Sequence, residues 1–297
     1  MTWLQTLTEP LSYGFMQRGM AASVMVGILC AVVGCFVVLR GMAYLGDAMS
    51  HAILPGIAIA YILKGDILLG ALVAAILVAL GIGFLTKRGA IKEDTAIGIL
   101  FAATLSLGVA LISTIKTYAL DLTHILFGNV LGVGETDLIL IAVLGIIVLA
   151  TIVLLYKELL VVSFDPVLAS TIRLPTEFLK NLLLVLMALV VVVSLQTVGV
   201  GLVAAMLVTP AATAYLVTRR LPSMMVMSAL LGALASVMGL YLSYYFNIAS
   251  GAAVVLTATV FFILVYLLAP QRGLLWSALR RERRMRADSK TAPIAHT

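Results

Sequence analysis

The chain has 297 residues, of which 63% are hydrophobic and 11% are charged, whereas about 25% of the residues in an average soluble domain are charged. This composition excludes a soluble globular protein. The formal net charge of +6 does not indicate a nucleic-acid partner, because the basic residues lie between apolar runs and in a C-terminal tail.

Apolar runs of about 20 residues recur along the chain, and each is long enough to cross roughly 30 Å of hydrocarbon as a helix. Backbone groups that face lipid must satisfy their own hydrogen bonds, so such runs form helices. We therefore expect an all-α integral membrane protein with about nine transmembrane helices. In chain order the predicted spans are 15–39, 44–63, 67–86, 95–115, 137–156, 178–198, 199–218, 224–245 and 251–269.

The distribution of Lys and Arg predicts the orientation of these spans. If the Arg-rich tail is cytoplasmic, all but three of the 19 basic residues fall on the cytoplasmic side, the exceptions being Arg18, Lys64 and Lys116. Cytoplasmic loops of membrane proteins carry such an excess. We expect an N-terminus outside, a transmembrane domain over residues 1–279, and a basic, disordered cytoplasmic tail over 280–297.

The apolar stretch from 178 to 218 is the weakest point of this topology. Its only turn signal is the short sequence Thr197-Val198-Gly199-Val200-Gly201. If the stretch were one long span, the orientation of every earlier span would reverse and most basic loops would lie outside. The charge bias argues against that arrangement.

The most informative stretch lies early in the second predicted span, where Asp47 and His51 stand four residues apart. On a helix this spacing places a carboxylate and an imidazole on one face, about one turn apart. Ionisable residues inside a membrane are costly and mark function. One oxygen and one nitrogen ligand suit Mn²⁺, Fe²⁺ or Zn²⁺ better than Mg²⁺ or Ca²⁺. The same two residues could instead form a structural ion pair between helices.

Two neighbouring features favour the metal-ligand interpretation. Small residues recur at every fourth position, at Ala48, Ala52, Gly56 and Ala60, which lets another helix approach closely. Pro55 interrupts the helical hydrogen bonding, and interrupted helices often mark binding sites in transporters. One helix supplies only two ligands, so a second copy of the chain across a two-fold axis is the simplest way to complete the coordination shell. The chemistry therefore predicts a homodimer.

A second pair of candidate ligands lies in a loop on the predicted outer side. Asp121 and His124 are three residues apart and could also chelate a metal. They could equally cap and orient a short helix that lies along the membrane surface, and this interpretation is favoured. If this short helix has a function of its own, we expect it to form a docking surface for an external partner.

Two motifs on the predicted cytoplasmic side have the sequence of helix starts. In the first, Phe164 precedes Asp165 as the N-cap and Pro166 at the first helical position,. A short helix there could bind a soluble partner, and the alternative is a plain surface loop. In the second, Glu93 and Asp94 stand just before the fourth span, where the helix dipole favours negative charge.

Several motifs of catalysis are absent from the sequence. There is no Gly-x-x-x-x-Gly-Lys-Ser/Thr phosphate loop, so this chain does not bind ATP in the usual P-loop manner,. No Ser-His-Asp or His-Glu-x-x-His arrangement appears. We expect a transport protein and no enzyme activity in this chain. The rivals are a proton-coupled secondary transporter, with Asp47 and His51 as a proton relay, and a structural subunit in which they join helices.

Several ordered motifs closely resemble the membrane permeases of manganese/zinc/iron ABC importers, and the resemblance covers roughly Leu11 to Leu274. Together the motifs are specific, although any one alone would be weak. They are the segments 45–56 (LGDAMSHAILPG), 93–99 (EDTAIGI), 124–129 (HILFGN), 163–166 (SFDP) and 208–214 (VTPAATA).

The resemblance implies a permease that works as a homodimer in the plasma membrane. Two copies of a separate ATPase would bind its cytoplasmic face, and an extracellular or periplasmic metal-binding protein would dock outside. Asp47 and His51 of both subunits would hold the metal on its path, and residues 164–166 would belong to the coupling helix inserted into the ATPase. The family's coupling region commonly has a glycine after this motif, where the segment 169–175 of this chain has none.

The resemblance also bears on the transported metal. Permeases that resemble manganese importers tend to show the pattern Asp-Ala-x-Ser-His-Ala-x-Leu-Pro-Gly, and some zinc importers replace its Ser and Pro positions. Ser50 and Pro55 therefore favour Mn²⁺, although the ligand chemistry suits Zn²⁺ and Fe²⁺ as well. The metal is the transported substrate, and no permanently bound cofactor is expected.

Overall fold

The computed structural model describes residues 9–87, 89, 91–114 and 130–269 of the chain. Over these ranges the structure consists of helices and the turns between them, with no strand. The expectation of an all-α protein is thus confirmed for this part of the molecule. The predicted tail at 280–297 lies outside the described residues.

The helices follow the predicted apolar runs in chain order. Their bounds are η1 Pro10–Ser12, α2 Gly14–Leu39, α3 Leu45–Ala52, α4 Leu54–Ile62, α5 Ile67–Thr86, α6 Glu93–Ser113, η2 Val130–Gly132, α8 Glu135–Leu154, α9 Tyr156–Phe164, α10 Pro166–Thr171, α11 Thr176–Val198, α12 Val200–Val217, α13 Leu221–Phe246 and α14 Ser250–Leu268. Most ends lie within a few residues of the predicted span limits.

Eight helical segments in the described ranges are long and apolar enough to cross a membrane. One of them, Leu45–Ile62, is made of α3 and α4 together. The remaining predicted span, 199–218, corresponds to α12, whose apolar part Gly201–Val217 is shorter than the other eight. The chain does turn at Gly199, with a φ of 84° that glycine adopts readily,, so the stretch 178–218 is two helices and not one.

The second span is interrupted at Ile53, close to Pro55, where the sequence predicts that the helical hydrogen bonding is broken. Pro55 in the first turn of α4 has no N–H to donate, and its ring would clash with the carbonyl of residue 51 in a continuous helix,. The span therefore consists of the eight-residue helix α3 followed by α4.

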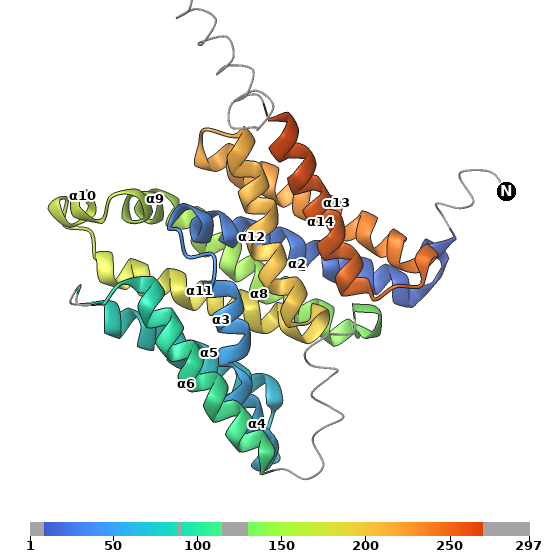
Figure 1. Ribbon diagram of the computed structural model, residues 1–297, viewed down its shortest axis with the longest axis horizontal. Coiled ribbons are helices and arrows are strands. Elements are labelled where there is room, and N and C mark those ends of the chain that lie inside the picture. Colours follow the sequence, from blue (N-terminus) through green and yellow to red (C-terminus); the bar gives the residue numbers. More distant parts are fainter. Residues whose placement is uncertain (1–8, 88, 90, 115–129, 270–297) are drawn as a thin grey trace, which may run out of the picture.

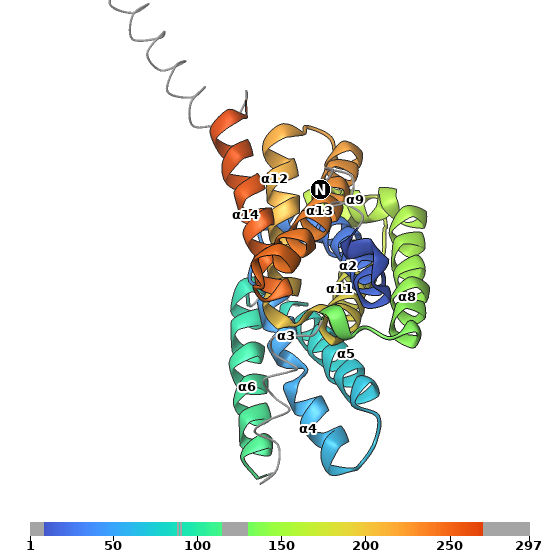
Figure 2. The same cartoon turned by 90° about the vertical axis from the view of Figure 1, so that its right-hand side faces the viewer.

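The helices form two groups with α3 between them. In both views α4, α5 and α6 lie together on one side of the molecule, and α12, α13 and α14 lie on the other (Figures 1 and 2). The central helix α2 packs against α12 and α13, and both of its cysteines and most of its valines are buried. Helix α3 contacts α6 and α5 of the first group and α12 and α11 of the rest.

Ion pairs between helix ends agree with the predicted grouping of loops. Arg40 after α2 pairs with Glu93 at the start of α6, and Lys87 after α5 pairs with Glu177 at the start of α11. All four residues belong to loops that the charge distribution places on the cytoplasmic side. Loops that the charge distribution assigns to the same side of the membrane are therefore joined by ion pairs in the structure.

Close helix contacts depend on glycine. A side chain at Gly34 in α2 would overlap the backbone carbonyl of Leu207 in α12, so the two backbones touch at this point. At Gly98 in α6, by contrast, an added Cβ would meet no other atom within 4 Å. The same substitution should therefore have opposite effects at the two positions.

We expect Gly34→Ala to destabilise the protein by about 1–3 kcal/mol, because α2 and α12 must move apart to admit the methyl group. Gly98→Ala should be neutral or stabilise by about 0.5–1 kcal/mol, because alanine is the better helix former. Thermal unfolding of both variants in detergent measures the difference. An unchanged midpoint for Gly34→Ala would contradict the close packing of α2 against α12.

Candidate metal site

The predicted ligand pair lies on the short helix α3. Asp47 stands in its first turn and His51 in its last turn, so both side chains project from the same face, as the spacing of four residues predicts,. The Oδ1 atom of Asp47 and the Nε2 atom of His51 are 3.6 Å apart. The structure therefore brings the two predicted ligands together.

This separation suits shared coordination of one ion. Metal–ligand bonds of about 2.1 Å place two neighbouring donor atoms roughly 3.0–3.4 Å apart in octahedral or tetrahedral geometry. Asp47 and His51 would close to that distance through small side-chain movements. A direct hydrogen bond is a poorer description, because 3.6 Å exceeds the usual N–H···O range.

The two side chains differ in their environment. The His51 side chain is 24% exposed and that of Asp47 is 54% exposed, so the carboxylate faces away from the core of its own chain. The Nδ1 atom of His51 is buried and makes no hydrogen bond to any described residue. The ring instead packs edge-on against Phe101 of α6, with 5.7 Å between the centroids.

The described part of the chain offers only two adjacent side-chain ligands of this kind, Asp47 and His51. Within the described ranges, no group of three or more His, Cys, Asp and Glu side chains could hold a metal ion. Asp121 and His124, the other predicted ligand pair, lie outside the described residues.

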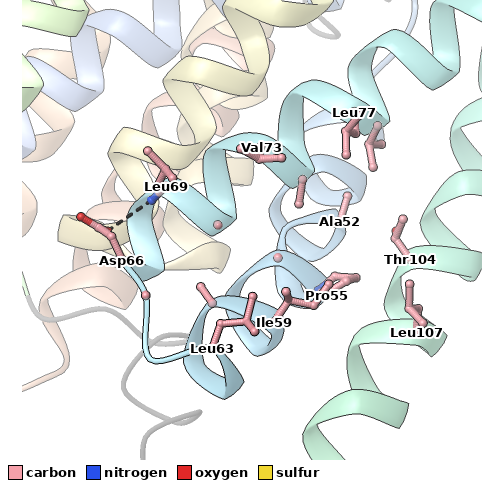
Figure 3. A pocket seen from close by; sticks show the side chains of 16 residues that line it. Ala52, Pro55, Ile59, Leu63, Asp66, Leu69, Val73, Leu77, Thr104 and Leu107 are labelled. Atoms are coloured by element: carbon pink, nitrogen blue, oxygen red, sulfur yellow. Dashed lines mark hydrogen bonds between the residues drawn. The ribbon is translucent and has the colours of Figure 1, made fainter.

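An apolar groove of about 440 Å³ begins beside the ligand pair at Ala52 and runs between α4, α5 and α6 (Figure 3). Its polar side chains are Asp66 and Thr104. Asp66 caps α5 by accepting hydrogen bonds from the backbone N–H groups of Leu68 and Leu69. The groove thus lacks the ligands that a cation needs.

A buried ion pair near the start of α3 was not predicted. The guanidinium of Arg40 contacts the carboxylate of Glu93 at 2.5 Å, and its side chain is only 6% exposed. The sequence indicates only that Glu93 and Asp94 favour a helix start, and both do lie in the first turn of α6. The position of Arg40 directly after a long apolar run could have indicated a buried ion pair, but this position does not identify Glu93 as the partner.

The predicted helix start at Asp165 is confirmed. Asp165 accepts hydrogen bonds from the backbone N–H groups of Val167 and Leu168, at 3.1 and 2.9 Å, and Pro166 is the first residue of α10. After α10, Arg173 takes a left-handed φ of 60°. The chain therefore turns there without the glycine that such a conformation favours.

The segment from α9 to α10 presents apolar side chains at one end of the molecule. It projects from the helix bundle in Figure 1. Phe164 is 61% exposed, and Val167, Leu168 and Ile172 are also exposed. Contiguous apolar side chains on an exposed loop end are typical of an interaction surface.

Comparisons with known proteins show a family relationship over nearly the whole chain. Residues 12–269 match the model of the ABC 3 transport family. The manganese transport system membrane protein MntC of Listeria monocytogenes is 50% identical, over 91% of this chain and 96% of that protein. MntC of Halalkalibacterium halodurans is 46% identical, over 92% and 94%.

A solved structure agrees with these relatives. It is described as PsaBC from Streptococcus pneumoniae in complex with Fab, and the matched chain is 43% identical, with a TM-score of 0.80 over 91% of this chain and 98% of that one. The chain belongs to the ABC 3 transport family of permeases. It is a multi-pass protein of the plasma membrane.

The cap at Asp165 gives a test of the α10 segment. Asp165→Ala should weaken α10 by about 1 kcal/mol, because two backbone N–H groups lose their acceptor. Hydrogen exchange of the amides of Val167 and Leu168 should then become about 5-fold faster. Asp165→Asn is the matched control, since Asn caps as well as Asp. Equal exchange in the Ala variant and the wild type would contradict the role of the cap.

Proposed function

We propose that this chain is the permease subunit of an ATP-driven importer of divalent transition-metal ions, with Mn²⁺ as the favoured substrate. The observation that carries the proposal is the pairing of Asp47 with His51 at 3.6 Å on α3. A carboxylate oxygen and an imidazole nitrogen are ligands for Mn²⁺, Fe²⁺ and Zn²⁺. The names of the relatives and the pattern around Ser50 and Pro55 favour Mn²⁺ among these.

In this proposal the metal binds between two copies of the chain. Each copy supplies two donor atoms, and a six-coordinate or four-coordinate ion needs more than two. The half-exposed carboxylate of Asp47 is available to a partner that approaches α3. Ala48 and Ala52 of the same helix are buried within this chain, so a partner would approach the face of α3 that carries Asp47.

The two ends of the bundle would bind different partners. The exposed apolar side chains of Phe164, Val167 and Leu168 would enter a separate cytoplasmic ATPase, which supplies the energy because this sequence has no phosphate loop. An external metal-binding protein would deliver the ion to the opposite end. The N-terminus lies outside and the C-terminus lies in the cytoplasm, with α12 as the ninth span.

Transport then proceeds by exchange of ligands. The ion leaves the delivery protein, loses part of its hydration shell to the two Asp47/His51 pairs, and is released to the cytoplasm when closure of the ATPase tilts the helices. The permease carries out no bond-making chemistry, so the ion needs only to be bound firmly enough to enter and weakly enough to leave.

The double variant Asp47→Ala/His51→Ala tests the proposal. We expect the purified permease–ATPase complex to lose Mn²⁺ binding, measured by calorimetric titration, because all the proposed donor atoms are removed. Glu135→Ala is the control, since it removes a highly exposed carboxylate from α8, and it should bind Mn²⁺ normally. Wild-type affinity in the Asp47/His51 variant would refute the proposed site.

A further inference from the structure

Helix α6 runs alongside the span that carries the metal ligands and contacts it at three levels. Glu93 pairs with Arg40 just before α3, and Phe101 packs on His51 at the end of α3. Near the start of α4, a Cβ added at Gly108 would lie 2.7 Å from the Cβ of Leu54. The three α6 residues are each about two helical turns apart, so they form one continuous stripe.

The first contact fixes the start of α3. Arg40 follows the last residue of α2, where its own N–H donates to the carbonyl of Phe36 at 3.0 Å, and the chain then turns at Gly41 with a φ of 72°. The guanidinium is buried with Glu93 as its ionic partner. A buried charge that loses its partner is strongly unfavourable. The pairing of Arg40 with Glu93 therefore holds the turn at Gly41 next to the first residue of α6.

The second contact orients the imidazole. A histidine that binds metal usually donates its other ring N–H to a carboxylate or a carbonyl, which fixes the ring plane. His51 has no such bond within the described part of the chain, although its Nδ1 atom is buried. The ring of Phe101 lies edge-on to the imidazole, with 65° between the planes. Aromatic packing thus takes the place of the usual hydrogen bond.

Helix α3 needs such support because it is short and separate. It has eight residues, with a turn at Gly41 before it and the break at Ile53 after it. Its ends are therefore not held in place by a longer continuous helix. Metal affinity requires donor atoms placed to within a fraction of an ångström, so the elements that contact α3 decide whether Asp47 and His51 can share an ion.

We propose that α6 positions the metal ligands, with Phe101 setting the plane of the His51 ring and the Arg40–Glu93 pair fixing the start of α3. Phe101 and Glu93 are positioning residues that do not touch the metal. This inference rests on the proposed function, because it concerns the same site. It assigns to α6 a role in metal affinity in addition to its role in packing.

The test measures Mn²⁺ affinity of the complete permease–ATPase complex in lipid nanodiscs. Phe101→Leu should weaken binding roughly 10-fold or more, the usual effect of removing an outer-shell partner of a metal ligand. Phe101→Tyr keeps the ring and should bind nearly as well as the wild type. Phe261→Leu is the matched control, because Phe261 is also a partly buried phenylalanine but lies in α14, away from the site.

The ion pair is tested by removing both charges at once. Arg40→Met/Glu93→Met leaves no unpaired buried charge, so the variant should fold, yet its Mn²⁺ affinity should also fall roughly 10-fold. Glu177→Gln breaks the exposed pair Lys87–Glu177 and should leave the affinity unchanged. The electron paramagnetic resonance spectrum of bound Mn²⁺ should change in Phe101→Leu and stay the same in Phe261→Leu.

The outcomes separate the inference from the proposed function. Wild-type affinity and an unchanged Mn²⁺ spectrum in Phe101→Leu and in the Arg40/Glu93 double variant would overturn the positioning role. Equal losses of affinity in Phe101→Leu and Phe261→Leu would also overturn it, because they would reflect general destabilisation. If Asp47→Ala/His51→Ala still bound Mn²⁺, the proposed function itself would fail, whatever the other variants did.

Discussion

A divalent cation enters hydrocarbon only if protein atoms replace the water that surrounds it. The cost of removing that water is far larger than any single contact can offset, so several donor atoms must face the path of the ion at one level. In the described structure, Asp47 and His51 on α3 provide two such atoms within 3.6 Å. The rest of the fold places these two atoms.

This constraint explains the unusual construction of the second span. A continuous helix would satisfy all its backbone groups internally, which is the safest arrangement in lipid. The chain instead breaks at Ile53, next to Pro55, and so separates α3 from α4. The interrupted span places α3 between the two groups of helices seen in Figure 2. It also makes that position dependent on neighbouring helices, above all α6.

The helical fold could be predicted from the sequence because apolar length is a strong signal in a membrane protein. Asp165 and Pro166 gave the start of α10 in the same direct way, since an N-cap followed by proline has a local cause,. The break at Ile53 was partly foreseen: Pro55 indicated the interruption,, but not the residue at which α3 ends.

Long-range partners could not be predicted in the same way. The spacing of Asp47 and His51 gave their proximity, because one helical turn separates them. Arg40 and Glu93 are 53 residues apart in the chain, and the sequence contains no local feature that joins them. Phe101 likewise resembles any other aromatic residue of an apolar helix. Such contacts arise only when the helices are packed, so they could not be predicted, whereas the proximity of Asp47 and His51 could.

The central claim is that one metal ion is bound by Asp47 and His51 from two copies of the chain. Pulsed electron paramagnetic resonance of Mn²⁺ in the purified complex counts the imidazole nitrogens bound to the ion. Each copy offers one His51, so the account predicts two nitrogens per Mn²⁺, both absent in His51→Ala. A single nitrogen per Mn²⁺, or a signal that His51→Ala leaves unchanged, would contradict it.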